Sequence, residues 1–90
     1  MKRNAEKIRL TRRFLVQNLE RLGFDVPSSQ SNFVLARRPG KNLRSLYLAL
    51  KQRRILVRYF DAPATRDALR ITVGTDHEIR ILLRELRRLM

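Results

Sequence analysis

Residues 55–78 read ILVRYFDAPATRDALRITVGTDHE, and this is the most informative stretch of the sequence. Its two ends are rich in apolar and β-branched residues, which predicts strands at 55–60 and 69–73 joined by a loop. Each predicted strand contains one arginine, Arg58 or Arg70. An arginine within a strand is costly unless it meets an anion, and its guanidinium group binds carboxylate or phosphate through two parallel hydrogen bonds. The stretch therefore predicts a site for a doubly anionic small molecule.

Apolar residues recur at helical spacing in three other parts of the chain, which predicts three amphipathic helices. The first helix covers residues 5–22, the second carries the apolar stripe from 43 to 50, and the third follows residue 75. Asn4 is the expected N-cap of the first helix, and Gly23 is the expected left-handed residue after it. Thr75 and Glu78 have the spacing of a capping box. A proline and three serines at 24–31 predict a connector.

These elements predict an α/β domain in two layers, with a three-stranded sheet and three helices on one face. Residues 32–37 supply the remaining strand, so the expected order along the chain is α-β-α-β-β-α. A right-handed crossover makes the strands at 32–37 and 55–60 parallel. The strand at 69–73 can then lie between them, antiparallel to both. Residues 1–90 are expected to form this single domain.

Side chains alternate between the two faces of a strand, so Arg58 and Arg70 are both predicted to point away from the helices. The other residues expected on that face are Leu56, Phe60 and Thr72, with Val34 and Ala36 if the first strand follows the same phase. This face is too apolar for water and too charged for a core. We therefore expect another domain or subunit to cover it.

The chain is strongly basic, with 21 lysines and arginines against eight acidic residues and a formal net charge of +13. The basic residues occur in every region and alternate with no row of aromatic residues. This distribution favours a charged, solvated surface over a defined nucleic-acid site, although loose electrostatic binding of nucleic acid is expected. The absence of cysteine excludes disulfides and thiolate metal sites. No apolar run approaches the roughly 18 residues of a membrane span, so we expect a cytoplasmic protein.

Three stretches, in this order, carry a resemblance to a known family: LGFDVPSSQSNFVLAR at 22–37, RRILVRYFDAP at 53–63 and ALRITVGTDHE at 68–78. They resemble the C-terminal small domain of histidinol-phosphate aminotransferase, a fold-type-I enzyme that depends on pyridoxal 5′-phosphate. The resemblance extends over nearly the whole chain, and LRITVGT is its most specific part. It implies an aminotransferase small domain whose large cofactor-binding domain is not in this sequence.

The resemblance also implies roles for both arginines. Arg70 would bind the α-carboxylate of the amino donor and Arg58 would lie near the substrate phosphate, whereas Asn32 and Phe33 would be structural. The implied reaction transfers an amino group between histidinol phosphate and 2-oxoglutarate. In the complete enzyme, a homodimer, this domain would close over the cofactor cleft and orient the substrate.

We expect the chain alone to be inactive and to bind no cofactor. The Schiff-base lysine of the family, and the residues around the pyridine ring, belong to the large domain. None of the four lysines here has a suitable sequence context: Lys2, Lys7, Lys41 and Lys51. The missing large domain is therefore an expected partner, together with a small anionic substrate.

Two other functions are left open by the sequence. One is a free-standing basic module that binds nucleic acid, and the other is the small domain of a related enzyme, such as a threonine-phosphate decarboxylase or an aromatic aminotransferase. Salt bridges from Arg58 and Arg70 to nearby acids are the structural alternative to an anion site; the candidate acids are Asp61, Asp67 and Glu78. The remaining polar candidates are expected to have no catalytic or metal-binding role: His77, Asp61, Asp67, Ser28, Ser29 and Ser31.

Overall fold

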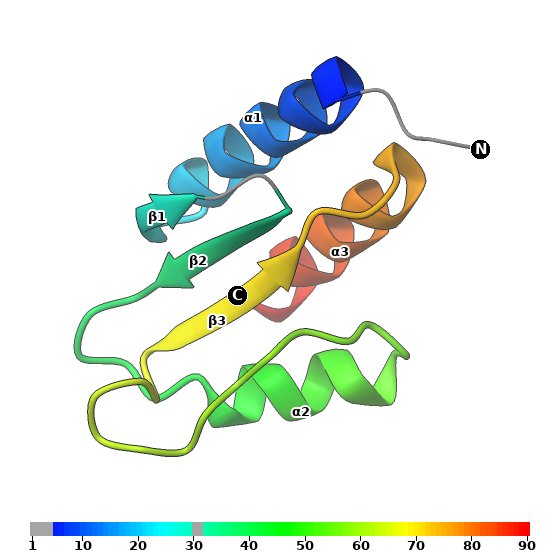
Figure 1. The fold of residues 1–90 in the computed structure, drawn as a ribbon. Coiled ribbons are helices and arrows are strands. Elements are labelled where there is room, and N and C mark those ends of the chain that lie inside the picture. The colour runs from blue at the N-terminus through cyan, green and yellow to red at the C-terminus, as the bar shows by residue number, and fades with distance from the viewer. Residues whose placement is uncertain (1–4, 30–31) are drawn as a thin grey trace.

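The structure is a computed structural model that describes residues 5–29 and 32–90. Its helices and strands are α1 (Ala5–Arg21), β1 (Asp25–Ser29), β2 (Phe33–Arg37), α2 (Arg44–Gln52), β3 (Ala68–Thr72) and α3 (Asp76–Leu89) (Figure 1). The α/β class, the three-stranded sheet and the three helices are confirmed. The predicted N-cap Asn4 lies outside the described residues. No helix within the described ranges is long and apolar enough to cross a membrane.

The sheet has the order β1-β2-β3, and neighbouring strands are antiparallel. In the central strand β2, Val34 lies opposite Ile71 and Ala36 lies opposite Leu69. An isolated antiparallel bridge joins Arg58 to β3 on the side away from β2. Strand β3 therefore runs between β2 and the segment around Arg58, antiparallel to both, as predicted.

The element order α-β-β-α-β-α differs from the prediction because a strand, β1, lies where a connector was expected. This strand pairs with β2 alone, so it is an edge of the sheet. Its register shifts between Asp25 and Ser28, around Pro27. Proline lacks an N–H donor and is tolerated at such an irregular edge. The proline and serines that predicted a connector are therefore compatible with an edge strand.

The prediction of a strand at 55–60 is wrong, since only Arg58 in this segment forms a bridge. At the start of the segment, the N–H of Ile55 donates to the C=O of Leu50 at 2.9 Å, at the end of α2. At its end, the C=O of Phe60 accepts hydrogen bonds from the loop that follows. Because both ends are held by other contacts, the segment meets β3 only at its middle.

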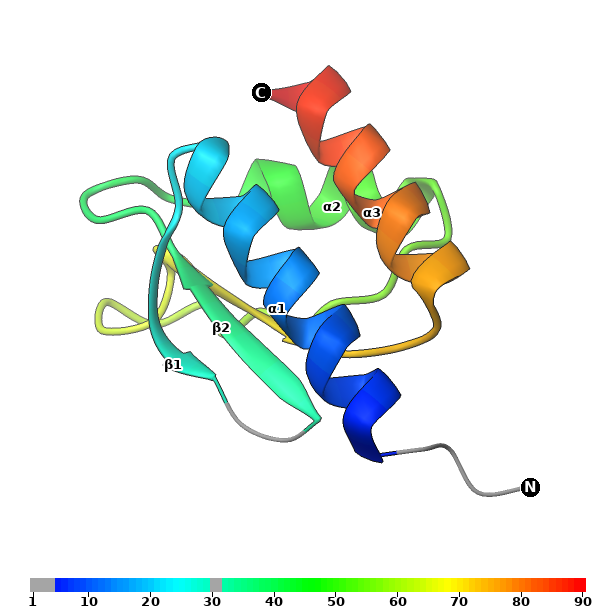
Figure 2. The same ribbon diagram turned by 90° about the horizontal axis from the view of Figure 1, so that it is seen from above.

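All three helices lie on one side of the sheet (Figure 2), as predicted. The largest fully buried side chains come from the helices and from β2 and β3: Leu15, Leu19, Leu50, Leu69, Ile71, Ile79, Leu83, Leu86 and Val34. Full burial of a side chain of this size stabilises the folded chain by roughly 1.5–3 kcal/mol. The packing of these helices leaves the other face of β2 and β3 open.

The predicted helix ends within the described residues are confirmed. Gly23 has a φ of 95°, which an L-residue rarely adopts, and it follows the last turn of α1. At α3, the N–H of Thr75 donates to Glu78 Oε1 at 2.8 Å, and the N–H of Glu78 donates to Thr75 Oγ1 at 3.2 Å. This reciprocal pair is the predicted capping box.

Polar contacts also link the helices. The hydroxyl of Thr11, a buried residue of α1, donates to Asp76 Oδ1 at the start of α3, at 2.6 Å. The Nε of Arg53, at the end of α2, donates to Glu85 Oε1 on α3 at 2.8 Å. These contacts join α1 and α2 to α3, and α3 in turn packs behind the strands that carry the candidate site.

Candidate anion-binding site

Arg58 and Arg70 lie directly opposite each other across the bridge. The N–H of Arg58 donates to the C=O of Arg70, and the N–H of Arg70 donates to the C=O of Arg58, both at 2.9 Å. In such a hydrogen-bonded pair the Cα atoms are about 5.5 Å apart and the side chains leave the same face. Both arginines are exposed, whereas the flanking Leu69 and Ile71 are buried. The prediction that both arginines point away from the helices is confirmed.

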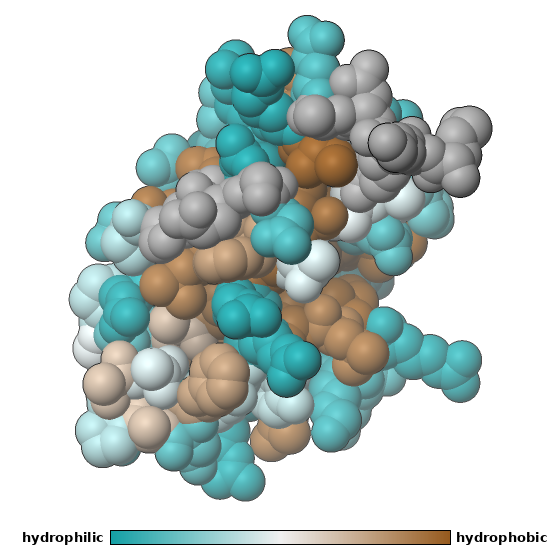
Figure 3. All heavy atoms as spheres, in the orientation of Figure 1, coloured by the Kyte–Doolittle hydropathy of each residue, from teal (hydrophilic) through white to brown (hydrophobic). Residues whose placement is uncertain are grey.

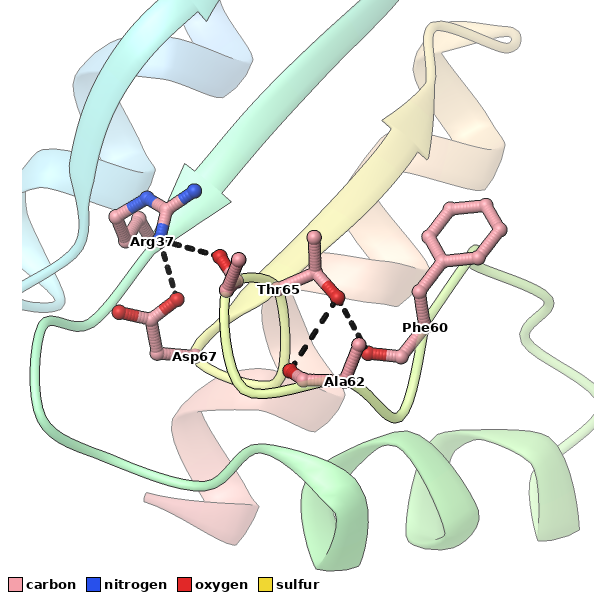
Figure 4. A network of polar contacts seen from close by, with 6 residues as sticks. Arg37, Phe60, Ala62, Thr65 and Asp67 are labelled. Carbon is pink, nitrogen blue, oxygen red and sulfur yellow. Dashed lines mark hydrogen bonds and ion pairs between the residues drawn. The ribbon is translucent and has the colours of Figure 1, made fainter.

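Neither arginine has a carboxylate within 4.0 Å in the described part of the chain. The acids proposed as salt-bridge partners have other contacts. Asp67 pairs with Arg37, which also donates to the C=O of Ala64 at 3.5 Å (Figure 4). Glu78 belongs to the capping box described above. The arrangement therefore leaves two adjacent guanidinium groups available to a bound anion.

The third acid, Asp61, lies near Tyr59. Desolvation and then the negative charge of Asp61 raise the pKa of the Tyr59 hydroxyl above its ordinary value. That hydroxyl donates to Asn42 Oδ1 at 3.1 Å, and the ring of Tyr59 stacks on Tyr47 with a centroid separation of 5.4 Å. These contacts hold the chain just after Arg58 against α2.

The loop between the bridge and β3 is held by a polar network. The hydroxyl of Thr65 donates to the C=O of Phe60 at 2.8 Å and is within 3.5 Å of the C=O of Ala62 (Figure 4). The N–H of Arg38 donates to the C=O of Asp67 at 2.8 Å. The loop thereby joins the end of β2 to the segment that carries Arg58.

The side chains of β2 alternate in the opposite sense to the one considered from the sequence, in which Val34 and Ala36 would share the face of Arg58 and Arg70. Val34 and Ala36 are fully buried on the helix side, because they pair with the buried residues of β3. The open face instead receives Phe33 opposite Thr72 and Leu35 opposite Arg70. Arg37 points to the same face of the strand as Phe33 and Leu35. Because a charged side chain is rarely buried, Arg37 was the signal in the sequence that this face is the one away from the helices.

Apolar and basic side chains share the open face. Leu56 and Phe60 are 77% and 54% exposed, and Thr72 is exposed as well. Figure 3 shows brown apolar atoms beside teal hydrophilic ones across this side of the molecule. The guanidinium carbon of Arg70 lies 5.1 Å from the centroid of the Phe33 ring, within the range of a cation–π contact. The family resemblance implies only a structural role for Phe33, so this contact adds to the predicted site.

The other predicted residues lie apart from this face. His77 is exposed in the first turn of α3, and no group of three potential metal ligands occurs among the described residues. Lys7, Lys41 and Lys51 are exposed on α1, before α2 and on α2. Lys2 and Ser31 are outside the described residues. The segments of the open face thus contain arginine but no lysine.

Comparisons with known proteins show the family to which the chain belongs. Residues 1–86 match the model of the family described as aminotransferase class I and II. The chain belongs to this family, which depends on pyridoxal 5′-phosphate.

Histidinol-phosphate aminotransferases are among the curated proteins similar to this chain. Histidinol-phosphate aminotransferase 1 of Nostoc sp. is 46% identical over 84 residues, which cover 93% of this chain and 24% of that protein. The histidinol-phosphate aminotransferase of Synechocystis sp. is 51% identical over 78 residues, 87% of this chain and 22% of that protein. The chain therefore spans about a quarter of the length of these relatives.

Solved structures show the same fold. A NifS-like protein superposes with a TM-score of 0.79 at 21% identity, over 94% of this chain and 27% of that chain. A protein from Erwinia carotovora atroseptica, provisionally assigned as a histidinol-phosphate aminotransferase, superposes with a TM-score of 0.76 at 25% identity. That match covers 92% of this chain and 23% of the other.

Proposed function

We propose that this chain is the C-terminal small domain of a histidinol-phosphate aminotransferase and binds the anionic groups of its substrates. Arg70 binds the α-carboxylate of the amino donor, and Arg58 binds the substrate phosphate. The complete enzyme transfers an amino group between histidinol phosphate and 2-oxoglutarate. Identity of 46% to a histidinol-phosphate aminotransferase over 84 residues supports this choice of substrates.

One observation carries the proposal: Arg58 and Arg70 lie directly opposite each other on the open face, and neither guanidinium group has a carboxylate partner among the described residues. Like charges directly opposite each other destabilise a sheet. A carboxylate or phosphate beside Arg58 and Arg70 offsets that repulsion, and each hydrogen bond to a charged group contributes about 1.5–3 kcal/mol. Two positive charges on one face, without a neighbouring carboxylate among the described residues, therefore favour an anionic ligand.

The contribution of this chain is binding and orientation of substrate. Pyridoxal 5′-phosphate, when bound to the enzyme, carries the amino group between the two substrates. The open face has no lysine to attach it, so the residues described here do not fit the cofactor. We assign the cofactor to the large domain. That domain and the second subunit of a homodimer cover the open face, including the exposed Leu56 and Phe60.

The first test is the reading frame upstream of Met1 in the native gene. We expect the frame to continue through a large domain that contains the cofactor lysine. A stop codon followed by a start signal at Met1 would contradict assignment of the chain to a complete aminotransferase.

The second test is steady-state kinetics of the complete enzyme. Arg70→Ala should raise KM for glutamate roughly 30-fold or more, since truncation of one partner of a buried charge pair costs about 2–5 kcal/mol. Arg58→Ala should raise KM mainly for histidinol phosphate. Arg13→Ala is the matched control, because Arg13 is exposed on α1, on the helix side of the sheet. Unchanged KM values in both site variants would remove the proposed roles.

A further inference from the structure

The guanidinium group of Arg70 is held over an aromatic ring in the free protein. Its Cζ atom lies 5.1 Å from the centroid of Phe33. Phe33 is directly opposite Thr72, so Arg70 is its diagonal neighbour across β2 and β3. Diagonal neighbours are within reach of long and aromatic side chains. The contact therefore follows from the register of the two strands.

The ring itself occupies a well-supported position. Phe33 is half-buried at the start of β2. The preceding residue, Asn32, accepts a hydrogen bond through its C=O from the N–H of Val73 at 2.9 Å. The neighbouring Val34 is fully buried and paired with Ile71. Backbone pairing on both sides of Phe33 thus fixes the backbone position from which the ring extends.

The contact also decides on which side of β3 the charge lies. Phe33 belongs to β2, whereas Arg58 is bridged to the opposite edge of β3. The guanidinium group of Arg70, when it lies over Phe33, is therefore displaced toward β2. It is displaced away from the edge of β3 to which Arg58 is bridged. Without the ring, the long side chain of Arg70 can take rotamers in which its guanidinium group no longer lies over β2.

We propose that Phe33 is a positioning residue that holds the Arg70 guanidinium on the β2 side. The site then presents two separate cationic groups and selects a substrate pair whose carboxylate and phosphate occupy different positions. This inference rests on the proposed role of Arg70. Cation–π contacts contribute enough to shift affinity several-fold.

The test is the kinetics of the complete enzyme with Phe33→Leu, which removes the ring face and keeps an apolar side chain. We expect KM for glutamate to rise about 3- to 10-fold with kcat unchanged, and Phe33→Tyr to restore it. Phe33→Met is a second ring-free variant in case Phe33→Leu fails to fold. Phe14→Leu is the matched control. The Cζ atom of Arg80 lies 5.4 Å from the centroid of the Phe14 ring, in a similar contact on the helix side of the sheet.

The outcomes separate the two proposals. If Arg70→Ala raises KM for glutamate but Phe33→Leu and Phe33→Met do not, the positioning role of Phe33 is wrong and the role of Arg70 stands. If Arg70→Ala also leaves KM unchanged, the proposed function itself fails. An equal rise in KM for Phe14→Leu would show a general loss of stability and would also overturn the positioning role.

Discussion

Replacement of Glu85 by glutamine removes a carboxylate that contacts three arginines where α2 meets α3. Glu85 Oε1 accepts a hydrogen bond from Arg53 Nε at 2.8 Å. Glu85 Oε2 lies 3.4 Å from Arg84 Nε and 3.8 Å from Arg88 Nη1. The Glu85 side chain is only 10% exposed. The substitution therefore leaves cationic groups around a nearly buried neutral amide.

The expected loss of stability follows from the exposure of each partner. A hydrogen bond to a charged group contributes about 1.5–3 kcal/mol, and the 41% exposure of Arg53 places its bond toward the lower end. The contacts of Arg84 and Arg88, which are 61% and 70% exposed, contribute roughly 0–0.5 kcal/mol each. We expect Glu85→Gln to lower the free energy of unfolding by about 2 kcal/mol, equivalent to roughly 8–16 °C in Tm for a chain of this size.

Urea unfolding followed by circular dichroism measures this free energy. Glu20→Gln is the control, since Glu20 is exposed on α1. A double-mutant cycle with Arg53→Met isolates the Arg53–Glu85 interaction. A loss below about 0.5 kcal/mol, or one equal to that of the control, would contradict a stabilising role of Glu85, because it would mean that the contact is fully screened by water.

Two further substitutions test the helix end and the core. Thr75→Ala should cost about 1 kcal/mol in urea unfolding, because it removes the side-chain cap of α3, and Thr75→Ser should retain most of the stability; equal losses for both would contradict the capping role. Leu83→Ala should cost about 2–5 kcal/mol in the same assay, because Leu83 is 1% exposed. Leu10→Ala, at a position that is 56% exposed, should change stability by about 0.5 kcal/mol or less, and a loss equal to that of Leu83→Ala would contradict the observed packing.

Local patterns in the sequence predict the features that depend on a few adjacent residues. The capping box at Thr75 and the left-handed Gly23 are short-range signals, and both are present. Strand alternation also predicts correctly that Arg58 and Arg70 share the face opposite the helices, because both lie in segments whose parity is set by buried neighbours.

Features that depend on distant partners are harder to predict. The strand β1 forms only because β2 lies alongside it, and its Pro27 argues locally against any strand. The segment 55–60 has strand-like composition, yet contacts at its two ends leave only one bridge. The cation–π contact between Phe33 and Arg70 depends on the register of β2 against β3, which composition does not specify.

A crystal structure of the complete enzyme with its substrates bound is the most direct test of the two-arginine site. With glutamate bound, we expect the α-carboxylate oxygens about 2.7–2.9 Å from the guanidinium nitrogens of Arg70. With histidinol phosphate bound, we expect the phosphate to contact Arg58, and the ring of Phe33 to remain beneath Arg70. Substrate anions held entirely by residues outside this chain, with Arg58 and Arg70 in contact only with solvent or protein, would contradict the proposed function.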